Sequence, residues 1–189
     1  MPFCNREFAF LPHIRDALIM AKPHLYLLVG YPGSGKTTVA KIIHEKTGAE
    51  HLWTDWERRS MFESPTHSQN ESDQLYAYLN NLTEQLLGEG KDVIFDTSFN
   101  FRKDRNHLRE IAERQNAETT VIWVTTDKNI SKRRALEGGN TRNGYDKPMT
   151  KKQFERIAQH LEPPAENEKV IKIDGTDVDS QELLGLLGL

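Results

Sequence analysis

Short apolar runs alternate along the chain with longer segments in which apolar residues recur every three or four positions. The short runs have the length of buried strands, and the longer segments have the spacing of amphipathic helices. The predicted strands are Leu25–Val29, His51–Thr54, Val93–Phe95, Thr120–Thr125 and Val170–Ile173. The predicted helices are Lys36–Thr47, Asp55–Phe62, Ser72–Leu87, Lys103–Gln115, Asn129–Glu137, Lys151–Leu161 and Gln181–Leu187. This alternation predicts an α/β fold of three layers, in which helices cover both faces of a parallel sheet.

Two segments interrupt this alternation. Residues 1–24 precede the first predicted strand and form an N-terminal extension, with a helix expected at about Ile14–Ala21. Gly138–Met149 is rich in glycine and asparagine, which predicts a mobile loop. We therefore expect one domain over residues 25–189, with a mobile lid at about 128–149.

The composition fits one soluble domain and excludes several classes of protein. The chain has 189 residues, of which 37% are hydrophobic and 28% are charged, and its net charge is −3. This size supports a full hydrophobic core, and the charge lacks the basic excess of a dedicated duplex-binding protein. Leu25–Val29 is too short to cross a bilayer, and the start of the chain lacks a signal-peptide pattern. Cys4 is the single cysteine and forms no internal disulfide, so we expect a cytoplasmic location and no membrane partner.

The residues that follow the first predicted strand match a phosphate-binding pattern, a glycine, four further residues and then Gly-Lys-Ser/Thr. They are Gly30-Tyr31-Pro32-Gly33-Ser34-Gly35-Lys36-Thr37. Glycines let the backbone curl so that its N–H groups face a polyphosphate, and the following helix adds its positive N-terminal end. Lys36 is placed to reach the β- and γ-phosphates, and the Thr37 hydroxyl is placed to ligate Mg²⁺. The residues expected to bind ATP are Gly30, Gly33, Ser34, Gly35, Lys36, Thr37 and Thr38.

Two acidic residues at the ends of predicted strands are candidates for catalysis. Asp55 comes directly after the second strand, and Arg58 lies one helical turn further along on the same face. Ligands bind at the carboxyl ends of such strands, so Asp55 is expected to take the proton of an attacking hydroxyl beside Arg58. A helix N-cap is the alternative role for Asp55, and the two roles are compatible. Asp96 ends the third strand like the acidic residue of the second NTPase motif, and we expect it to hold Mg²⁺ with Thr37.

Arginines later in the chain predict a closing lid. Arg133 and Arg134 lie near the end of a helix, and Arg142 lies in the glycine- and asparagine-rich loop. Lid arginines neutralise phosphate charge while the lid excludes water. Exposed helix charges are the alternative for these residues. For Arg102 and Arg105, which follow the third strand, a substrate contact and a surface position both fit the sequence.

These residues together resemble the polynucleotide-kinase and zeta-toxin-like branch of the P-loop kinases. The resemblance runs from about Leu25 to Arg142 and rests on the phosphate loop with Thr38, on Thr54-Asp55-x-x-Arg58, and on Phe95-Asp96-Thr97-Ser98-Phe99-Asn100 with Arg105 following. It implies a P-loop NTPase fold whose five-stranded parallel sheet has the order 2-3-1-4-5. It also implies that Asp55 is the general base, Arg58 its substrate-holding neighbour, and Arg134 and Arg142 the lid arginines. Position 56 is tryptophan where the polynucleotide kinases have a second acidic residue, a difference that weighs against a nucleic-acid acceptor.

We therefore predict transfer of the γ-phosphate of ATP to a hydroxyl acceptor, with Mg²⁺. Two acceptor classes fit, a nucleic-acid or nucleotide 5′-hydroxyl, which is slightly preferred, and a small molecule such as a sugar, antibiotic or metabolite. A regulatory ATP-binding protein without transfer is a further alternative. Thr125-Thr126-Asp127-Lys128 does not fit the guanine-reading Asn-Lys-x-Asp of a switch GTPase. The chain is also short for a ring-forming motor ATPase with its helical lid domain.

Overall fold

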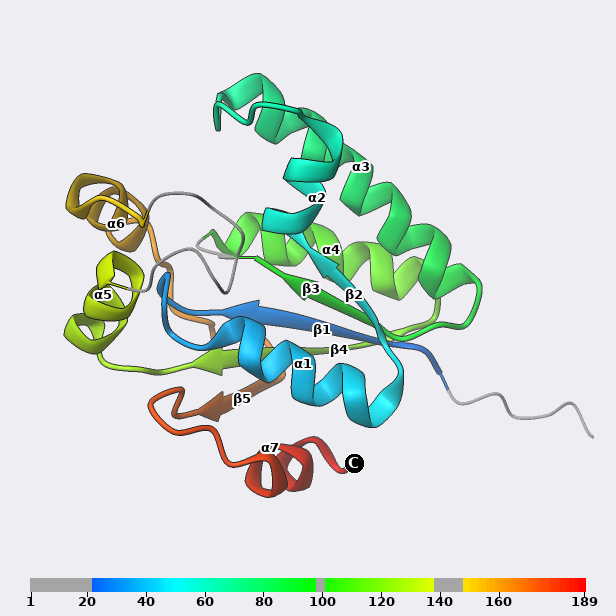
Figure 1. Cartoon of the computed structure of the whole chain (residues 1–189). Helices are drawn as coiled ribbons and strands as arrows, with labels where there is room; N and C mark the ends of the chain where they lie inside the picture. The colour runs from blue at the N-terminus through cyan, green and yellow to red at the C-terminus, as the bar shows by residue number, and fades with distance from the viewer. Residues whose placement is uncertain (1–21, 98–100, 138–147) are drawn as a thin grey trace, which may run out of the picture.

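The computed structural model describes residues 22–97, 101–137 and 148–189, over which strands and helices alternate as predicted (Figure 1). The strands are β1 (His24–Val29), β2 (Glu50–Trp53), β3 (Val93–Asp96), β4 (Glu118–Val124) and β5 (Val170–Ile173). The helices are α1 (Lys36–Thr47), α2 (Thr54–Met61), α3 (Gln69–Gly88), α4 (Arg102–Arg114), α5 (Lys128–Glu137), α6 (Lys151–Ala158) and α7 (Ser180–Leu187). None of the helices in these ranges is long and apolar enough to span a membrane. The helix expected at Ile14–Ala21 lies outside the described residues.

The five strands form one parallel sheet in the order β2-β3-β1-β4-β5, which confirms the predicted order. The central strand is β1, whose Leu25 pairs with Val93 of β3 on one side and Thr119 of β4 on the other. Because all strands run the same way, their carboxyl ends lie at one edge of the sheet. Ligands of such folds bind at this edge. Figure 1 shows α5 and α6 beside the carboxyl end of β1.

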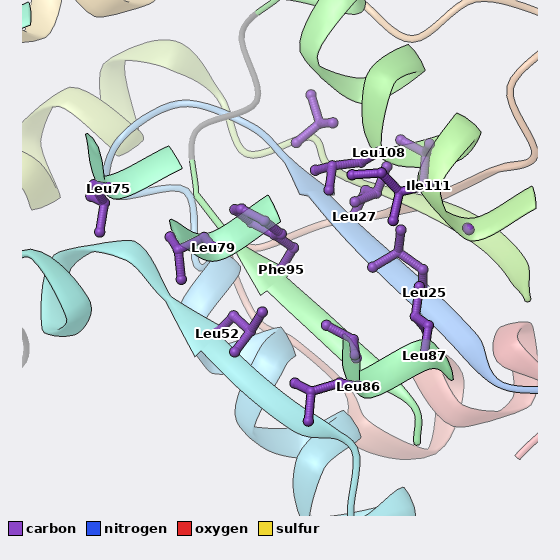
Figure 2. Packing of buried hydrophobic residues seen from close by; sticks show 14 residues of the cluster. Leu25, Leu27, Leu52, Leu75, Leu79, Leu86, Leu87, Phe95, Leu108 and Ile111 are labelled. Atoms are coloured by element: carbon purple, nitrogen blue, oxygen red, sulfur yellow. The ribbon is translucent and has the colours of Figure 1, made fainter. Parts of the chain in front are cut away.

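Helices cover both faces of the sheet and give it two apolar layers. Leu27 of β1 packs with Leu79 of α3 and Leu108 of α4 in the cluster drawn in Figure 2. Leu28, the next residue of β1, points to the opposite face and packs with Ile43 of α1 and with α7. A strand buried on both faces needs apolar residues at successive positions, which is why β1 is a continuous apolar run. The rigid layers hold the strand ends, and therefore the loops after them, in fixed positions.

Several boundaries differ from the sequence prediction, and two of these differences have identifiable reasons. Helix α3 begins at Gln69, earlier than the predicted Ser72, because Ser68 caps it: the Ser68 hydroxyl accepts a hydrogen bond from the Glu71 amide at 3.3 Å. Thr54 begins α2 instead of ending β2, and its hydroxyl donates to the backbone oxygen of Asp96 at 3.2 Å. The start of α2 is thereby fixed against the end of β3.

Candidate active site

The loop between β1 and α1 requires its glycines. The φ angles of Gly30, Gly33 and Gly35 are 151°, 77° and 106°, in the region that favours glycine. A Cβ on Gly33 would also lie 2.4 Å from the backbone oxygen of Ser131. Helix α1 begins directly afterwards, with no side-chain cap and no acidic residue in its first turn. Its positive N-terminal end is therefore directed at the position of a bound phosphate.

Two residues outside the motif support the loop, and sequence reasoning singled out neither. The Thr126 hydroxyl, just after β4, donates to the backbone oxygen of Ser34 at 2.6 Å. Gly175, just after β5, passes so close that a Cβ there would lie 1.9 Å from the same oxygen. A glycine two residues after the last predicted strand was the available signal, and it is a weak one. The loop is therefore held from two neighbouring strands as well as by its own turns.

Lys36 is buried at the base of the loop. Its Nζ donates to the backbone oxygens of Gly30 at 3.0 Å and Tyr31 at 2.9 Å. Burial lowers the pKa of Lys36, and the carboxylates of Asp96 and Asp55 act in the opposite direction. The predicted phosphate-binding lysine and both predicted acidic residues therefore lie at the same edge of the sheet, Asp96 at the end of β3 and Asp55 at the start of α2 after the neighbouring strand β2.

The hydroxyl groups of the loop fit a bound phosphate and Mg²⁺. Ser34 Oγ is buried and has no hydrogen-bond partner within the described residues, and a phosphate oxygen at the loop would satisfy it. Thr37 is half-buried and Thr38 is exposed on the first turn of α1. Over the described ranges, no three His, Cys, Asp or Glu residues form a metal-binding group. Mg²⁺ commonly uses one or two protein carboxylates together with substrate phosphates, so this result is compatible with Mg²⁺ held by Thr37 and Asp96, its predicted protein ligands.

Asp96 lies at the carboxyl end of β3 and is 3% exposed. Its Oδ2 is 3.1 Å from Nε2 of His51 on the edge strand β2. Trp53 pairs with Asp96 in the sheet register, so His51, two residues earlier, lies on the same face. Sequence reasoning gave His51 no role, because a histidine in a short strand carries no local signal for a partner on another strand.

Asp55 and Arg58 lie one turn apart on α2, as predicted. Arg58 is 7% exposed, and α3 holds its guanidinium: Nη2 donates to Ser72 Oγ at 3.3 Å, and Nη1 lies 3.6 Å from Glu71 Oε2. Asp55 is half-buried at the start of the helix. The N-cap residue of α2 is Trp53, so the alternative role of Asp55 as the N-cap is wrong.

His67 and Tyr76 border this pair. His67 has a left-handed backbone, with φ of 55°, which is uncommon outside glycine. Burial lowers the pKa of His67, Arg58 acts in the same direction, and Asp55 opposes them. The Tyr76 hydroxyl lies 2.9 Å from Thr97 Oγ1 after β3, and burial raises the pKa of Tyr76. The charges of Arg58 and Asp55 therefore act on the pKa of both side chains.

Of the predicted lid arginines, Arg134 is described, while Arg142 lies outside the described residues. Arg134 donates to the backbone oxygens of Gly175 at 2.6 Å and Thr176 at 2.7 Å. It therefore joins α5 to the segment after β5 that also supports the phosphate loop. Arg133, its neighbour, is exposed.

Arg105 lies neither at the surface nor in contact with a substrate position, the two alternatives predicted for it. It is fully buried and forms two parallel hydrogen bonds to Glu168, Nε to Oε2 at 2.7 Å and Nη2 to Oε1 at 2.9 Å. Burial acts to raise the pKa of Glu168, but the Arg105 hydrogen bond and the Ala165 amide outweigh it and leave that pKa lowered. Arg102 is exposed, which agrees with the surface position that was one of the two alternatives predicted for it.

The sheet order, the phosphate loop and the acidic strand ends define a P-loop NTPase with the fold of the P-loop kinases. The chain belongs to the AAA domain family, which it matches over residues 25–164. A search of curated proteins finds no match.

Several solved kinases share the fold at low sequence identity. A sugar kinase from Janibacter sp. HTCC2649 has a TM-score of 0.63 and 20% identity, covering 88% of this chain and 95% of that chain. A gluconokinase from Sinorhizobium meliloti 1021 has a TM-score of 0.61 and 19% identity, covering 87% and 89%. The Mycobacterium tuberculosis APS kinase, in complex with AMPPNP and APS, has a TM-score of 0.61 and 17% identity, covering 89% and 99%. These similarities show a shared fold and do not single out the polynucleotide-kinase branch.

Proposed function

We propose that the protein is a phosphotransferase that moves the γ-phosphate of ATP to a hydroxyl acceptor, with Mg²⁺. The observation that carries this proposal is the placement of two carboxylates at the edge of the sheet that carries the phosphate loop: Asp96 ends β3, and Asp55 lies in the first turn of α2, directly after the neighbouring strand β2. A loop for phosphates requires only the lysine and the glycines. A second carboxylate, on the helix that follows the neighbouring strand, is what transfer to a hydroxyl additionally needs.

Each group has a role that follows from its position. Lys36 and the loop amides bind the β- and γ-phosphates, with Ser34 and Thr38 as further contacts of the nucleotide. Thr37 and Asp96 are the protein groups that would hold Mg²⁺. The metal, when bound, neutralises charge that develops on the transferring phosphate.

The proposed transfer needs one base and one positioned acceptor. A bond forms from the acceptor oxygen to the γ-phosphorus, the bond from that phosphorus to the bridging oxygen breaks, and ADP leaves with the electron pair. Asp55 takes the hydroxyl proton. Arg58, fixed by α3 beforehand, binds a neighbouring anionic group of the acceptor, so little reorganisation is needed. Arg134 and Arg142 are proposed to act in a lid at about residues 128–149.

The acceptor is proposed to be a nucleic-acid or nucleotide 5′-hydroxyl, as in the polynucleotide-kinase and zeta-toxin-like branch. A small-molecule hydroxyl is the second candidate, because a sugar kinase and a gluconokinase share the fold. A regulatory protein that binds ATP without transfer is the third. Incubation with labelled ATP and pools of oligonucleotides, nucleosides, sugars and aminoglycosides separates them. Labelled product from any pool contradicts the regulatory alternative.

The base is tested by Asp55→Asn, which keeps the size of the side chain and removes the proton acceptor. We expect transfer to fall by about 100-fold or more, while ATP affinity stays within about twofold because Asp55 is not a nucleotide ligand. Asp73→Asn on the exposed face of α3 is the matched control. Wild-type transfer by Asp55→Asn would show that another group takes the proton.

A further inference from the structure

Glu71, in the first turn of α3, binds the loop that precedes its own helix. Its Oε1 accepts hydrogen bonds from the amide and the hydroxyl of Thr66, both at 2.8 Å, and its Oε2 accepts one from the amide of His67 at 2.7 Å. Two successive amides that face one anion form a nest, and the left-handed backbone of His67 is typical of this geometry. The bond from the Thr66 amide, with those from the Thr66 hydroxyl and the His67 amide, lowers the pKa of Glu71. The carboxylate is therefore charged at neutral pH.

This arrangement differs from the usual role of a glutamate at the third position of a helix. A side chain there normally accepts a hydrogen bond from the amide of the N-cap residue. Helix α6 follows this rule, since the Gln153 side chain accepts from the Thr150 amide at 2.8 Å. In α3 the N-cap residue is Ser68, whose amide donates to the Thr66 hydroxyl at 3.4 Å, while Glu71 binds the two residues before it. Helix capping therefore does not account for the position of the Glu71 carboxylate.

The same carboxylate faces Arg58 of α2, the helix that lies against α3 (Figure 1). Glu71 Oε2, which accepts the His67 amide, lies 3.6 Å from Arg58 Nη1. Arg58 is 7% exposed, and its Nη1 is buried and has no hydrogen-bond partner in the part of the chain that the structure describes. A guanidinium nitrogen in this situation has a donor available for a ligand. One oxygen atom therefore joins the loop to the arginine that the proposed function assigns to the acceptor.

We propose that Glu71 is a positioning residue of the acceptor site, which sets Arg58 and the loop 62–68 in one arrangement. This inference rests on the proposed function, in which Arg58 binds an anionic group of the acceptor. Removing the carboxylate releases three donors of the loop and takes away the charged partner of Arg58, which keeps its bond to Ser72. A guanidinium that is fixed in advance binds an anion with less loss of conformational freedom. The acceptor should therefore bind more weakly without Glu71.

Charge alone predicts the opposite effect, which makes the positioning role testable. Glu71 is negative and lies near Arg58, so removing its charge without any movement would strengthen the binding of an anion at Arg58. The measurement is a calorimetric titration of inorganic phosphate into protein saturated with Mg²⁺ and AMPPNP, an ATP analogue that occupies the phosphate loop. Arg58→Ala identifies the part of this binding that depends on Arg58. Phosphate binding that survives Arg58→Ala unchanged would place the anion elsewhere and overturn the proposal.

The central variant is Glu71→Gln, which keeps the size of the side chain and removes its charge. We expect the Kd of phosphate to rise by about 10-fold, and the Kd of AMPPNP to stay within about twofold because Glu71 is not a nucleotide ligand. Glu110→Gln, at an exposed position on α4, is the matched control. Tighter phosphate binding in Glu71→Gln would show that Glu71 competes with the anion for Arg58. Unchanged binding would confine Glu71 to the loop, and either result would overturn the proposal.

Hydrogen exchange tests the link between the loop and Arg58. If Glu71 sets the two together, phosphate bound at Arg58 must in turn favour the held loop, because coupling between two sites is reciprocal. Exchange of the Thr66 and His67 amides should therefore slow in wild-type protein when phosphate is added, by up to about 10-fold, and should not respond in Glu71→Gln. Exchange that is faster in Glu71→Gln but indifferent to phosphate in the wild type would overturn the proposed link.

Transfer is measured separately, so that a failure of the proposed function is recognised as such. With an acceptor found in the labelled-ATP pools, Glu71→Gln should raise the acceptor KM by about 10-fold and leave kcat and the KM of ATP within about twofold. Weaker phosphate binding in Glu71→Gln, without labelled product from any pool, supports the positioning role and contradicts phosphotransfer. Labelled product with an unchanged acceptor KM supports phosphotransfer and overturns the positioning role.

Discussion

His51 on the edge strand β2 lies 3.1 Å from the carboxylate of Asp96 on β3, at the position where Mg²⁺ is proposed to bind. Asp96 is nearly inaccessible to solvent, so its contact with the imidazole contributes to the orientation of the carboxylate. A partner that orients a metal-binding carboxylate affects metal affinity without touching the metal. The relationship therefore gives His51 a function that is testable separately from the nucleotide site.

His51→Ala should raise the Mg²⁺ concentration needed for half-maximal transfer by about 10-fold. The KM for the acceptor should stay unchanged, because Asp55 and Arg58 are not affected. His51→Gln, which keeps a hydrogen-bond donor, should restore part of the Mg²⁺ affinity. His107→Ala, at an exposed position on α4, is the control. An unchanged Mg²⁺ requirement in His51→Ala would mean that the strand alone orients Asp96.

Gly175 is required by its packing, because a Cβ there would lie 1.9 Å from the backbone oxygen of Ser34. Gly175→Ala should push the phosphate loop out of position and weaken ATP binding by about 10-fold or more, in line with the cost of overpacking. Calorimetric titration with ATP measures this effect. Gly185→Ala in α7, where a Cβ meets nothing within 4 Å, should instead stabilise the protein by about 0.5–1 kcal/mol. Equal ATP affinity in the two variants would contradict a supporting role for Gly175.

Arg134 holds the same segment from the other side, through the backbone oxygens of Gly175 and Thr176. Arg134→Lys keeps the charge, but a single ammonium cannot reproduce the planar fork that bonds two oxygens. We expect ATP affinity to fall by about 5-fold. Arg133→Lys, at the exposed neighbouring position, should change it little. Unchanged ATP affinity would show that these two contacts do not support the phosphate loop, and a fall in kcat would then reflect only the proposed lid role of Arg134.

The fold was predictable because its signals are local. The apolar run Leu25–Val29, the glycines of the loop and the amphipathic spacing of α3 each lie within one element, and β1 must be apolar throughout because it is buried on both faces. The strand order came from the resemblance to P-loop kinases, since no local pattern states which strands are neighbours.

The site was predictable only in part, because some of its contacts have no local signal in the sequence. Lys36 begins α1 after the loop from β1, Asp55 lies at the start of α2 after β2, and Asp96 ends β3, so the topology brings them to one edge. The contacts of His51 and Gly175 join residues that lie 45 and more positions apart and depend on sheet register and loop path. Arg105 was misplaced because a charged residue on a helix is usually exposed, and its partner Glu168 lies 63 residues away.

The buried pair of Arg105 and Glu168 joins α4 to the segment before β5. Removing one partner leaves a buried charge without its counterpart, so Glu168→Gln should lower the free energy of unfolding by about 3–5 kcal/mol. Urea denaturation at neutral pH measures the loss. Exchanging both residues for apolar ones, Arg105→Met with Glu168→Leu, should cost less than either single exchange, because no charge is then buried. A double variant as unstable as the sum of the single variants would mean that the two side chains do not act as a pair.

Acid supplies an independent test of the same pair. The pKa of Glu168 is lowered in the folded protein, so its charged form contributes stability above the unfolded value of 4.5. This contribution is lost as the pH falls below 4.5 and passes through the folded pKa, since protonation removes the charge that Arg105 binds. Wild-type protein should therefore lose stability more steeply than Glu168→Gln below pH 4.5, and the two curves should converge in strong acid. Parallel curves over that range would show that Glu168 titrates alike in the folded and unfolded chains, and that its bond to Arg105 does not depend on its charge.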